Sequence, residues 1–363
     1  MLKGLRVLDF SHYIPGPYAT MRLADLGAEV VKVEPLTGDL ARNASGIKEE
    51  SGIVFDANNR NKKSITVNLK TNEGVHRIKE LVKEADVVVE SFRPGVMTKL
   101  GVGYEQAKKI NPTLIYCSLS GYGQEGSLAH LGSHDLNYMA LSGLLSQMKD
   151  KEGRPIHPTL TFADLVGGLA ASEGILAALV RREREEKGAY VDAALLDSVI
   201  GFMNIHELLV KRTGKKTGMS LLDGTVVCYG IYETKDARYV SLAALEPKFW
   251  NNFCEAVDRI EWKGYQFTKA IDDEEFYENM KKLFMEKTME EWAKLGKRYD
   301  CCLTPVLEPG ELNSFSYCTE RMLIHNVNPQ LLYVATRLET NLKEANIPPT
   351  LGMNNEMVFS NQI

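Results

Sequence analysis

The sequence is poor in the features that mark several large classes of protein. Its six cysteines form no C-x-x-C pair and no cluster with histidine at metal-ligand spacing, so we expect neither a disulfide framework nor a metal site. The adjacent Cys301 and Cys302 are expected to be buried thiols. No run of about 18 apolar residues occurs, which argues against a membrane span. The formal net charge of −5 gives no general attraction for nucleic acid or an anionic membrane.

Signals for a dinucleotide cofactor and for targeting are also missing. The turn after the first apolar run lacks the G-x-G-x-x-G fingerprint, so a nicotinamide or flavin dinucleotide is not indicated. Lys3, Arg6 and Asp9 interrupt the start of the chain, unlike the apolar core of a secretory signal. The last residues, Asn361-Gln362-Ile363, are not a peroxisomal signal. We therefore expect a cytoplasmic protein without a bound cofactor.

The residues that are present describe a soluble globular protein with room for roughly two domains. Of the 363 residues, 44% are hydrophobic and 25% are charged. Short apolar runs predict strands at 5–8, 29–33, 64–69, 86–90 and 114–119. Helical spacing of apolar residues predicts helices at 18–26, 72–85, 104–110 and 165–186. Strands that alternate with helices indicate an α/β domain with a Rossmann-like parallel sheet.

The second half of the chain has a different pattern. Alternating residues at 226–232 and 239–245 predict a hairpin, followed by helices at 249–257, 276–285 and 289–295 and a short strand at 302–307. A helix at 198–210 and the Lys/Gly-rich segment 211–218 separate this region from the first half. We therefore expect a smaller α+β domain after a linker.

The stretch Gly132–Tyr138 (GSHDLNY) follows a predicted strand and begins a predicted helix. His134 therefore lies outside the carboxyl end of a strand, where ligands gather in open α/β sheets. A histidine in that place can titrate near neutral pH and move protons. It can also simply cap the helix, and position alone does not decide between the two interpretations.

Motifs spread over the chain favour the catalytic interpretation of His134. They are Gly4–Asp9 (GLRVLD), Ile14–Pro17 (IPGP), Ala24–Val30 (ADLGAEV), Arg93–Val96 (RPGV), Gly121–Gly126 (GYGQEG), His134–Tyr138 (HDLNY), Phe162–Asp164 (FAD), Leu245–Pro247 (LEP) and Pro348–Gly352 (PPTLG). Together they closely resemble the α-methylacyl-CoA racemases, which have the family III CoA-transferase fold. The resemblance implies a discontinuous large CoA-binding domain (1–197 and 326–363), a linker (198–224), a small domain (225–325) and an interlocked homodimer.

The resemblance also implies which residues are catalytic. Racemisation next to a thioester needs acid/base groups on opposite sides of a planar enolate, together with a donor for its oxygen. His134 and Asp164 match the acid/base pair. Glu246, from the small domain, is expected to orient His134, and the backbone N–H of Asp135 is expected to bind the enolate oxygen. From its position alone, Asp164 is better explained as the cap of the helix at 165–186.

Three functions fit these residues to different degrees. The first is a racemase that interconverts the C2 epimers of 2-methylacyl-CoA thioesters by 1,1-proton transfer. The second is a family III CoA-transferase, in which Asp164 attacks the thioester and forms an aspartyl anhydride. Transferases tend to have a glycine-rich loop where this chain has Ala243–Glu246, which favours the racemase. The third, an inactive CoA-binding protein, is disfavoured because His134, Asp164 and Glu246 occur together.

CoA phosphates need cations, and the segment Asn58–Lys63 (NNRNKK) supplies three. Such charge runs are more often solvated surface. Racemase relatives often have an arginine before the proline that ends the second strand, whereas here Glu34 precedes Pro35. Arg93 is expected either to contact CoA or to form an internal salt bridge. The predicted CoA contacts are Arg42, Arg60, Lys62, Arg93 and Tyr138. Racemases of this kind are expected to bind the acyl chain on an adaptable apolar surface that is often rich in methionine. Only Met203 and Met219 lie near the linker, which argues against broad tolerance for long or branched acyl chains and leaves the acyl group open.

Overall fold

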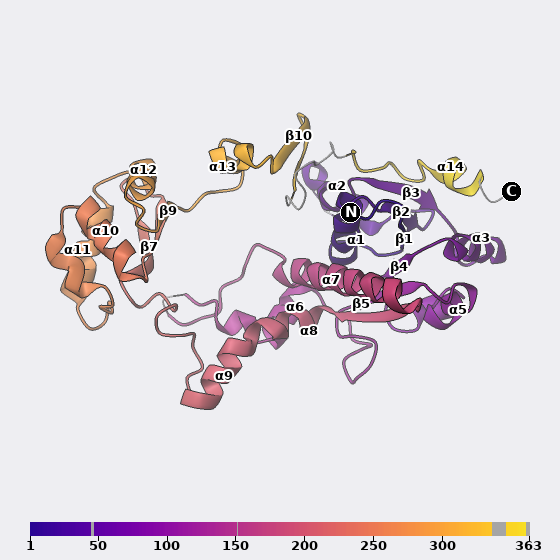
Figure 1. Ribbon diagram of the computed structural model, residues 1–363, viewed down its shortest axis with the longest axis horizontal. Helices are drawn as coiled ribbons and strands as arrows, with labels where there is room; N and C mark the ends of the chain where they lie inside the picture. Colours follow the sequence, from indigo (N-terminus) through magenta and orange to yellow (C-terminus); the bar gives the residue numbers. More distant parts are fainter. Residues whose placement is uncertain (45–46, 151, 336–345, 361–363) are drawn as a thin grey trace. The chain divides into compact units, whose positions relative to one another are not determined.

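The computed structural model describes residues 1–44, 47–150, 152–335 and 346–360. Contacts within the chain divide it into two compact units, which are residues 1–204 with 325–363 and residues 205–324. Figure 1 shows both units along the chain. Residues 336–345 and 361–363, which belong to the predicted large domain, lie outside the described residues.

A six-stranded parallel sheet in the order β3-β2-β1-β4-β5-β6 forms the centre of the first unit. The strands are β1 (Arg6–Asp9), β2 (Glu29–Glu34), β3 (Lys62–Thr66), β4 (Val87–Glu90), β5 (Ile115–Ser120) and β6 (Ala189–Ala194). The strand order reverses between β1 and β4, so their carboxyl ends form the crevice where such sheets bind ligands. This confirms the predicted Rossmann-like α/β architecture.

Helices cover both faces of this sheet because its strands alternate apolar residues between the two sides. On one face, Val7 packs in a cluster with α1 (Pro15–Asp25) and α7 (Phe162–Glu185). On the other face, Leu8 packs in a cluster with α3 (Asn72–Lys83) and α5 (Tyr104–Ile110). The shorter helices of this unit are α2 (Ile53–Asn58), α4 (Val96–Lys99), α6 (Asp135–Leu141), α8 (Leu195–Ile200) and α14 (Asn355–Phe359).

Helix α7 is long and apolar enough to cross a membrane by length and composition, although charged residues interrupt its apolar runs. Half of its most apolar window is buried inside the structure, where α7 packs in one cluster with α1 and the sheet. Its glycines explain the packing. A Cβ on Gly168 would lie 2.6 Å from the carbonyl oxygen of Pro15, and one on Gly167 would lie 2.1 Å from Leu195. Only glycine lets α1 and α8 approach α7 so closely.

The chain after the hairpin β10 (Ile324–Asn328) and β11 (Leu331–Val334) returns to the exposed edge of the sheet. The Asn354 amide oxygen accepts a hydrogen bond from the backbone N–H of Ser64 at 2.9 Å, and the Asn354 N–H donates to the Ser64 carbonyl. Asn355 accepts from the N–H of Thr66 at 2.8 Å. These contacts satisfy strand β3, whose unpaired edge would otherwise be open to another strand.

The second unit is a smaller α+β structure. Its antiparallel sheet has the order β7-β8-β9, formed by Tyr229–Glu233, Tyr239–Ala243 and Leu303–Pro305. Helices α10 (Pro247–Ala256), α11 (Glu274–Phe284) and α12 (Met289–Tyr299) pack on it around Trp250, Phe253 and Trp292. The predicted helix at 198–210 is instead α8, a short 3-10 turn and α9 (Asn204–Thr213), and α13 (Ser316–Glu320) lies near the end of the unit.

Several predicted boundaries differ from the structure. Strand β3 begins at Lys62 rather than residue 64, so Lys62 and Lys63 are part of the sheet, whereas Arg60 lies just before it. Helix α1 begins at Pro15, because proline fits the first turn of a helix. All six cysteines are free thiols, and Cys301 is buried as expected, whereas Cys302 is partly exposed.

Candidate active site

A cavity of about 830 Å³ opens where the strand order of the large sheet reverses. Its walls come from the loops that follow β1, β2, β4 and β5 and from the first turns of α6 and α7. His134, Asp135, Asp164, Arg93 and Tyr138 all line it. The structure therefore brings five of the nine predicted site residues into one cavity within the first unit.

His134 is the N-cap residue of α6 and has extended backbone angles. Its backbone N–H donates to the Asn137 side-chain oxygen at 3.0 Å, which fixes the start of the helix. The residue is exposed, so its imidazole remains accessible to a ligand in the cavity. The next residue, Asp135, begins the helix, and within the described residues no protein group accepts a hydrogen bond from its backbone N–H. A negatively charged oxygen can use such a donor.

Asp164 lies in the first turn of α7 and is not its cap, because Thr161 occupies the N-cap position. The explanation of Asp164 as a helix cap is therefore wrong. Its backbone N–H donates to the Asp135 carboxylate at 3.0 Å, which ties the starts of α6 and α7 together. Burial, together with the negative charge of Asp135, raises the pKa of Asp164 to about 7. A carboxyl group with this pKa can both give and take a proton at neutral pH.

Arg93 follows β4 and is exposed at the rim of the cavity. Among the described residues, no carboxylate forms an ion pair with it, which leaves its guanidinium available to an anionic ligand. A Cβ on Gly132 would lie 2.9 Å from its guanidinium, so glycine leaves room for Arg93 beside the loop that carries His134.

Tyr138 lies one helical turn after His134 and is buried. Its phenol oxygen accepts a hydrogen bond from Ser133 at 2.7 Å, and burial raises its pKa. A Cβ on Gly121 would lie 2.3 Å from this oxygen. Tyr138 lines the cavity. Its phenol contacts Ser133, in the loop before His134, and Gly121, in the loop after β5, and so holds these two loops together.

Three predicted CoA contacts do not line the cavity and are occupied by carboxylates. Arg42 donates two hydrogen bonds to Glu34, at 2.7 and 2.8 Å, and stacks on Phe55. Arg60 pairs with Asp25. Lys62 has no exposed side-chain surface. The geometry therefore supports structural roles for these cations rather than the predicted phosphate contacts.

Glu246 belongs to the second unit, where it is the exposed N-cap residue of α10. Its carbonyl accepts hydrogen bonds from the N–H groups of Phe249 and Trp250, which begin the helix. Among the described residues, no group of three or more His, Cys, Asp or Glu side chains is placed to hold a metal ion.

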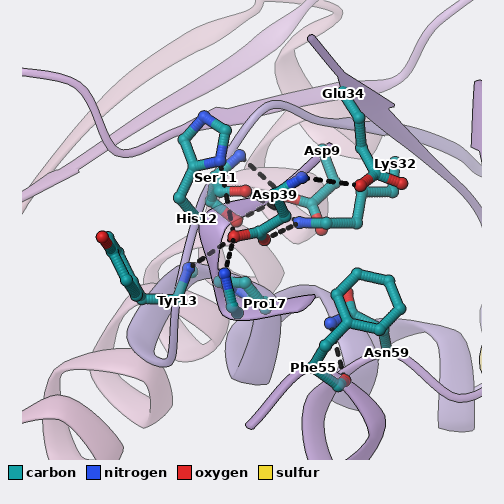
Figure 2. A network of polar contacts seen from close by, with 12 residues as sticks. Asp9, Ser11, His12, Tyr13, Pro17, Lys32, Glu34, Asp39, Phe55 and Asn59 are labelled. Atoms are coloured by element: carbon teal, nitrogen blue, oxygen red, sulfur yellow. Dashed lines mark hydrogen bonds and ion pairs between the residues drawn. The ribbon is translucent and has the colours of Figure 1, made fainter. Parts of the chain in front are cut away.

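Sequence reasoning missed a buried network of charges that contacts the loop after β1, drawn in Figure 2. Lys32 pairs with Asp39 at 2.9 Å, and both side chains are almost completely buried. Lys62 pairs with Asp9 at 3.0 Å and also donates to Asn59 and Thr20. Burial lowers the pKa of Lys62 to about 8, although Asp9 opposes the change. The available signal was a lysine inside the apolar strand EVVKVE, because a lysine is rarely buried without a partner.

This network holds a strained residue at the cavity wall. Tyr13 has a φ of 62°, in the left-handed region that bulky residues avoid. Such a conformation costs on the order of 1–3 kcal/mol and persists only when its surroundings impose it. Nothing in the sequence signals it, because glycine or asparagine would be expected at such a position.

Comparisons with known proteins agree with this architecture. The model of the family described as CoA-transferase family III matches residues 2–355. Alpha-methylacyl-CoA racemase from Homo sapiens is 34% identical over 332 residues, which cover 88% of this chain and 81% of the human protein. Succinyl-CoA:glutarate CoA-transferase from Mus musculus is 39% identical over 253 residues, which cover 68% of this chain but only 58% of the mouse protein.

A solved structure extends the agreement to the whole chain. The crystal structure of a CAIB/BAIF family protein from Brucella suis matches with a TM-score of 0.87 and 26% identity, and the match covers 99% of both chains. The relatives include racemases and transferases, so these similarities alone do not separate the two reactions. The family match over nearly the full length, together with the parallel sheet and its cavity, shows that the chain belongs to CoA-transferase family III.

Proposed function

We propose that this family III enzyme is a racemase that interconverts the C2 epimers of 2-methylacyl-CoA thioesters. One observation carries the proposal. His134 and Asp164 line the same cavity, and the pKa of Asp164 is raised to about 7. A group that both donates and accepts protons works best when it titrates near the operating pH. His134 supplies the second acid/base group, which an attack by Asp164 on the thioester would not need.

The proposed reaction is a 1,1-proton transfer. One of the two groups removes the α-proton, which leaves a planar enolate, and the other returns a proton to the opposite face. The backbone N–H of Asp135 is the proposed donor to the enolate oxygen, because it begins a helix and has no protein acceptor among the described residues. His134 and Asp164 then start the two directions of the reaction in opposite protonation states. No metal or redox cofactor is invoked.

CoA is proposed to enter along the rim that Arg93 occupies. This arginine lines the cavity and, within the described part of the chain, lacks a carboxylate partner, in contrast to Arg42 and Arg60. An arginine can hold a phosphate through two parallel hydrogen bonds. Arg93 is therefore the best supported of the predicted cationic contacts to CoA.

Glu246 and the homodimer remain predictions from the family resemblance. We propose that Glu246 orients His134, as carboxylates do for catalytic histidines, and that the active enzyme is a homodimer in the cytoplasm. Light scattering of the purified protein tests the oligomeric state. If Glu246 orients His134, Glu246→Gln should lower kcat and shift the pH profile while leaving KM for the thioester nearly unchanged.

The second candidate is a CoA-transferase that forms an anhydride on Asp164. The 39% identity to a mouse succinyl-CoA:glutarate CoA-transferase favours it, and so does the position of Asp164 in the cavity. This reaction needs no second acid/base group, so it leaves His134 without a chemical role.

Deuterium incorporation separates the two candidates. In D₂O, a racemase incubated with one epimer of a 2-methylacyl-CoA incorporates deuterium at the α-carbon and produces the other epimer. A transferase given an acyl-CoA and a free carboxylic acid moves CoA to the acid without α-exchange. Transfer without exchange would reject the proposed racemase, and exchange with epimerisation would support it.

A further inference from the structure

Tyr13 lines the same cavity as Asp164. The loop that carries it leads into α1, and the carbonyl oxygen of Pro15 lies 2.6 Å from the position that a Cβ on Gly168 would take. Asp164 and Gly168 are four residues apart on α7 and therefore share one face of that helix. The Tyr13–Pro15 segment thus packs one helical turn from the candidate catalytic carboxyl group.

Polar contacts hold the backbone at Tyr13 and at the two residues before it. Its own N–H donates to Asp39 at 3.3 Å, and Asp39 is fixed by its ion pair with Lys32. Lys32 also donates to the Ser11 carbonyl at 2.8 Å. The N–H of His12 donates to the Ser91 hydroxyl at 2.9 Å, which links the loop to the end of β4. The left-handed conformation of Tyr13 is therefore imposed by a network that the proposed chemistry does not use.

The Tyr13 ring points away from this network in Figure 2. Its exposed fraction is 46%, so the ring contributes surface to the cavity instead of filling the core. A strained backbone is retained when the position of the side chain matters, because a glycine would adopt the same conformation at no steric cost. The backbone is also tied at three consecutive residues, so the ring cannot retract by a shift of the loop.

We propose that Tyr13 determines which acyl groups fit, as a rigid wall that excludes long acyl chains, and that Asp39 is its positioning residue. The inference rests on the proposed acyl-CoA substrate and extends it to a substrate class, namely thioesters with short acyl groups. Asp39 is buried and does not itself line the cavity. It accepts from the Tyr13 N–H and also lies 3.6 Å from the His12 imidazole, so it acts on the cavity through the loop after β1.

The test measures binding, so it does not depend on which reaction the enzyme performs. Calorimetry measures the affinity for straight-chain acyl-CoA thioesters of increasing length, with free CoA as the reference ligand. The ratio of the affinities for short and long chains defines the preference for short chains. Each additional methylene that a pocket accepts or rejects changes selectivity by roughly tenfold or more. Tyr13→Gly should therefore reduce the preference for short chains at least about tenfold without changing the affinity for free CoA. Tyr13→Phe keeps the wall and should retain the wild-type preference.

Controls separate a local from a general effect. Tyr239→Ala removes a tyrosine that is equally exposed but lies in the second unit, and it should leave the preference unchanged. If Tyr13→Gly fails to fold, Tyr13→Asn replaces it, because asparagine tolerates the left-handed region. A wild-type preference in a folded small-residue variant at position 13 would overturn the proposal.

A double-mutant cycle tests the role of Asp39. Asp39→Asn alone should weaken the preference for short chains, because the neutral amide loses the ion pair with Lys32 that fixes the loop. In the Tyr13→Gly background the same change should have no further effect on the preference, since no wall remains to be positioned. An equal effect of Asp39→Asn in both backgrounds would reject the positioning role. The two proposals can fail separately. If the wild-type enzyme does not racemise its substrate but its chain-length preference still depends on Tyr13, the proposed reaction is rejected and this inference stands.

Discussion

The raised pKa of Asp164 predicts a specific dependence of stability on pH. The folded protein holds this proton with a pKa of about 7, against an ordinary value of 3.8. A difference of about three pKa units corresponds to roughly 4 kcal/mol, at 1.36 kcal/mol for each unit. Because the folded state binds the proton more tightly, the contribution of Asp164 to the free energy of unfolding falls as the pH rises from about 4 to 7. Above pH 7 the full cost of burying the charge is present.

Asp164→Asn removes this titration while keeping the size of the side chain. We expect the variant to be close to wild type in stability at pH 4 and more stable at pH 8, by up to about 4 kcal/mol. The three tryptophans, Trp250, Trp262 and Trp292, all lie in the second unit, so tryptophan fluorescence would follow the wrong part of the chain. Hydrogen exchange of peptides from the first unit, measured at several pH values in urea, reports the relevant unfolding.

Asp150→Asn is the matched control in the same unit. Hydrogen bonds donated by Arg154 lower the pKa of Asp150, so this replacement should lose stability at high pH rather than gain it. If Asp164→Asn and wild type show the same dependence of stability on pH, burial does not raise the pKa of Asp164, and the argument for its acid/base role fails.

Three further predictions follow from the packing and the charges. Lys62→Met should destabilise the protein by about 3–5 kcal/mol, because Asp9 is left buried without its partner. Calorimetry should show that the folded variant binds CoA with unchanged affinity. A weaker affinity would restore Lys62 as a CoA contact. Arg93→Gln should weaken CoA binding by about ten- to a hundredfold, the value of a hydrogen bond to a charged group, with an unchanged melting temperature; wild-type affinity would remove Arg93 from the site. Gly168→Ala should cost about 1–3 kcal/mol in urea denaturation, because the new methyl group meets the carbonyl of Pro15; a neutral effect would mean that α1 can move away from α7.

The central strands of the main sheet could be predicted from the sequence because they contain short, largely apolar runs. The three valines of β4 and the run in β5 are typical of parallel strands buried on both faces. Lys62 shows why the edge of the sheet could not be predicted. Its partner Asp9 lies 53 residues earlier, so a local pattern gives a charge run and not a buried ion pair. Strand β3 consequently begins two residues earlier than the pattern indicates.

Some residues of the candidate site could likewise be predicted from the sequence, and others could not. His134 and Asp164 could be identified because short motifs beside them resemble a known family, and the strand order then explains why they share a cavity. Arg42 could not be excluded from the sequence, because its partner Glu34 was visible only as a departure from the family pattern. The left-handed backbone of Tyr13 depends on contacts with Asp39, 26 residues later, and no residue type announces it.

The central claim is that His134 and Asp164 act on opposite faces of one carbon atom. The most direct measurement follows α-deuterium incorporation into each epimer of a 2-methylacyl-CoA in D₂O, separately for His134→Ala and Asp164→Asn. A variant that retains one base can exchange the α-hydrogen on one face but cannot invert the centre. We predict that each variant exchanges only one epimer, that the two variants exchange opposite epimers, and that neither forms the other epimer. Exchange of the same epimer by both variants, or full racemisation by either, would contradict the account.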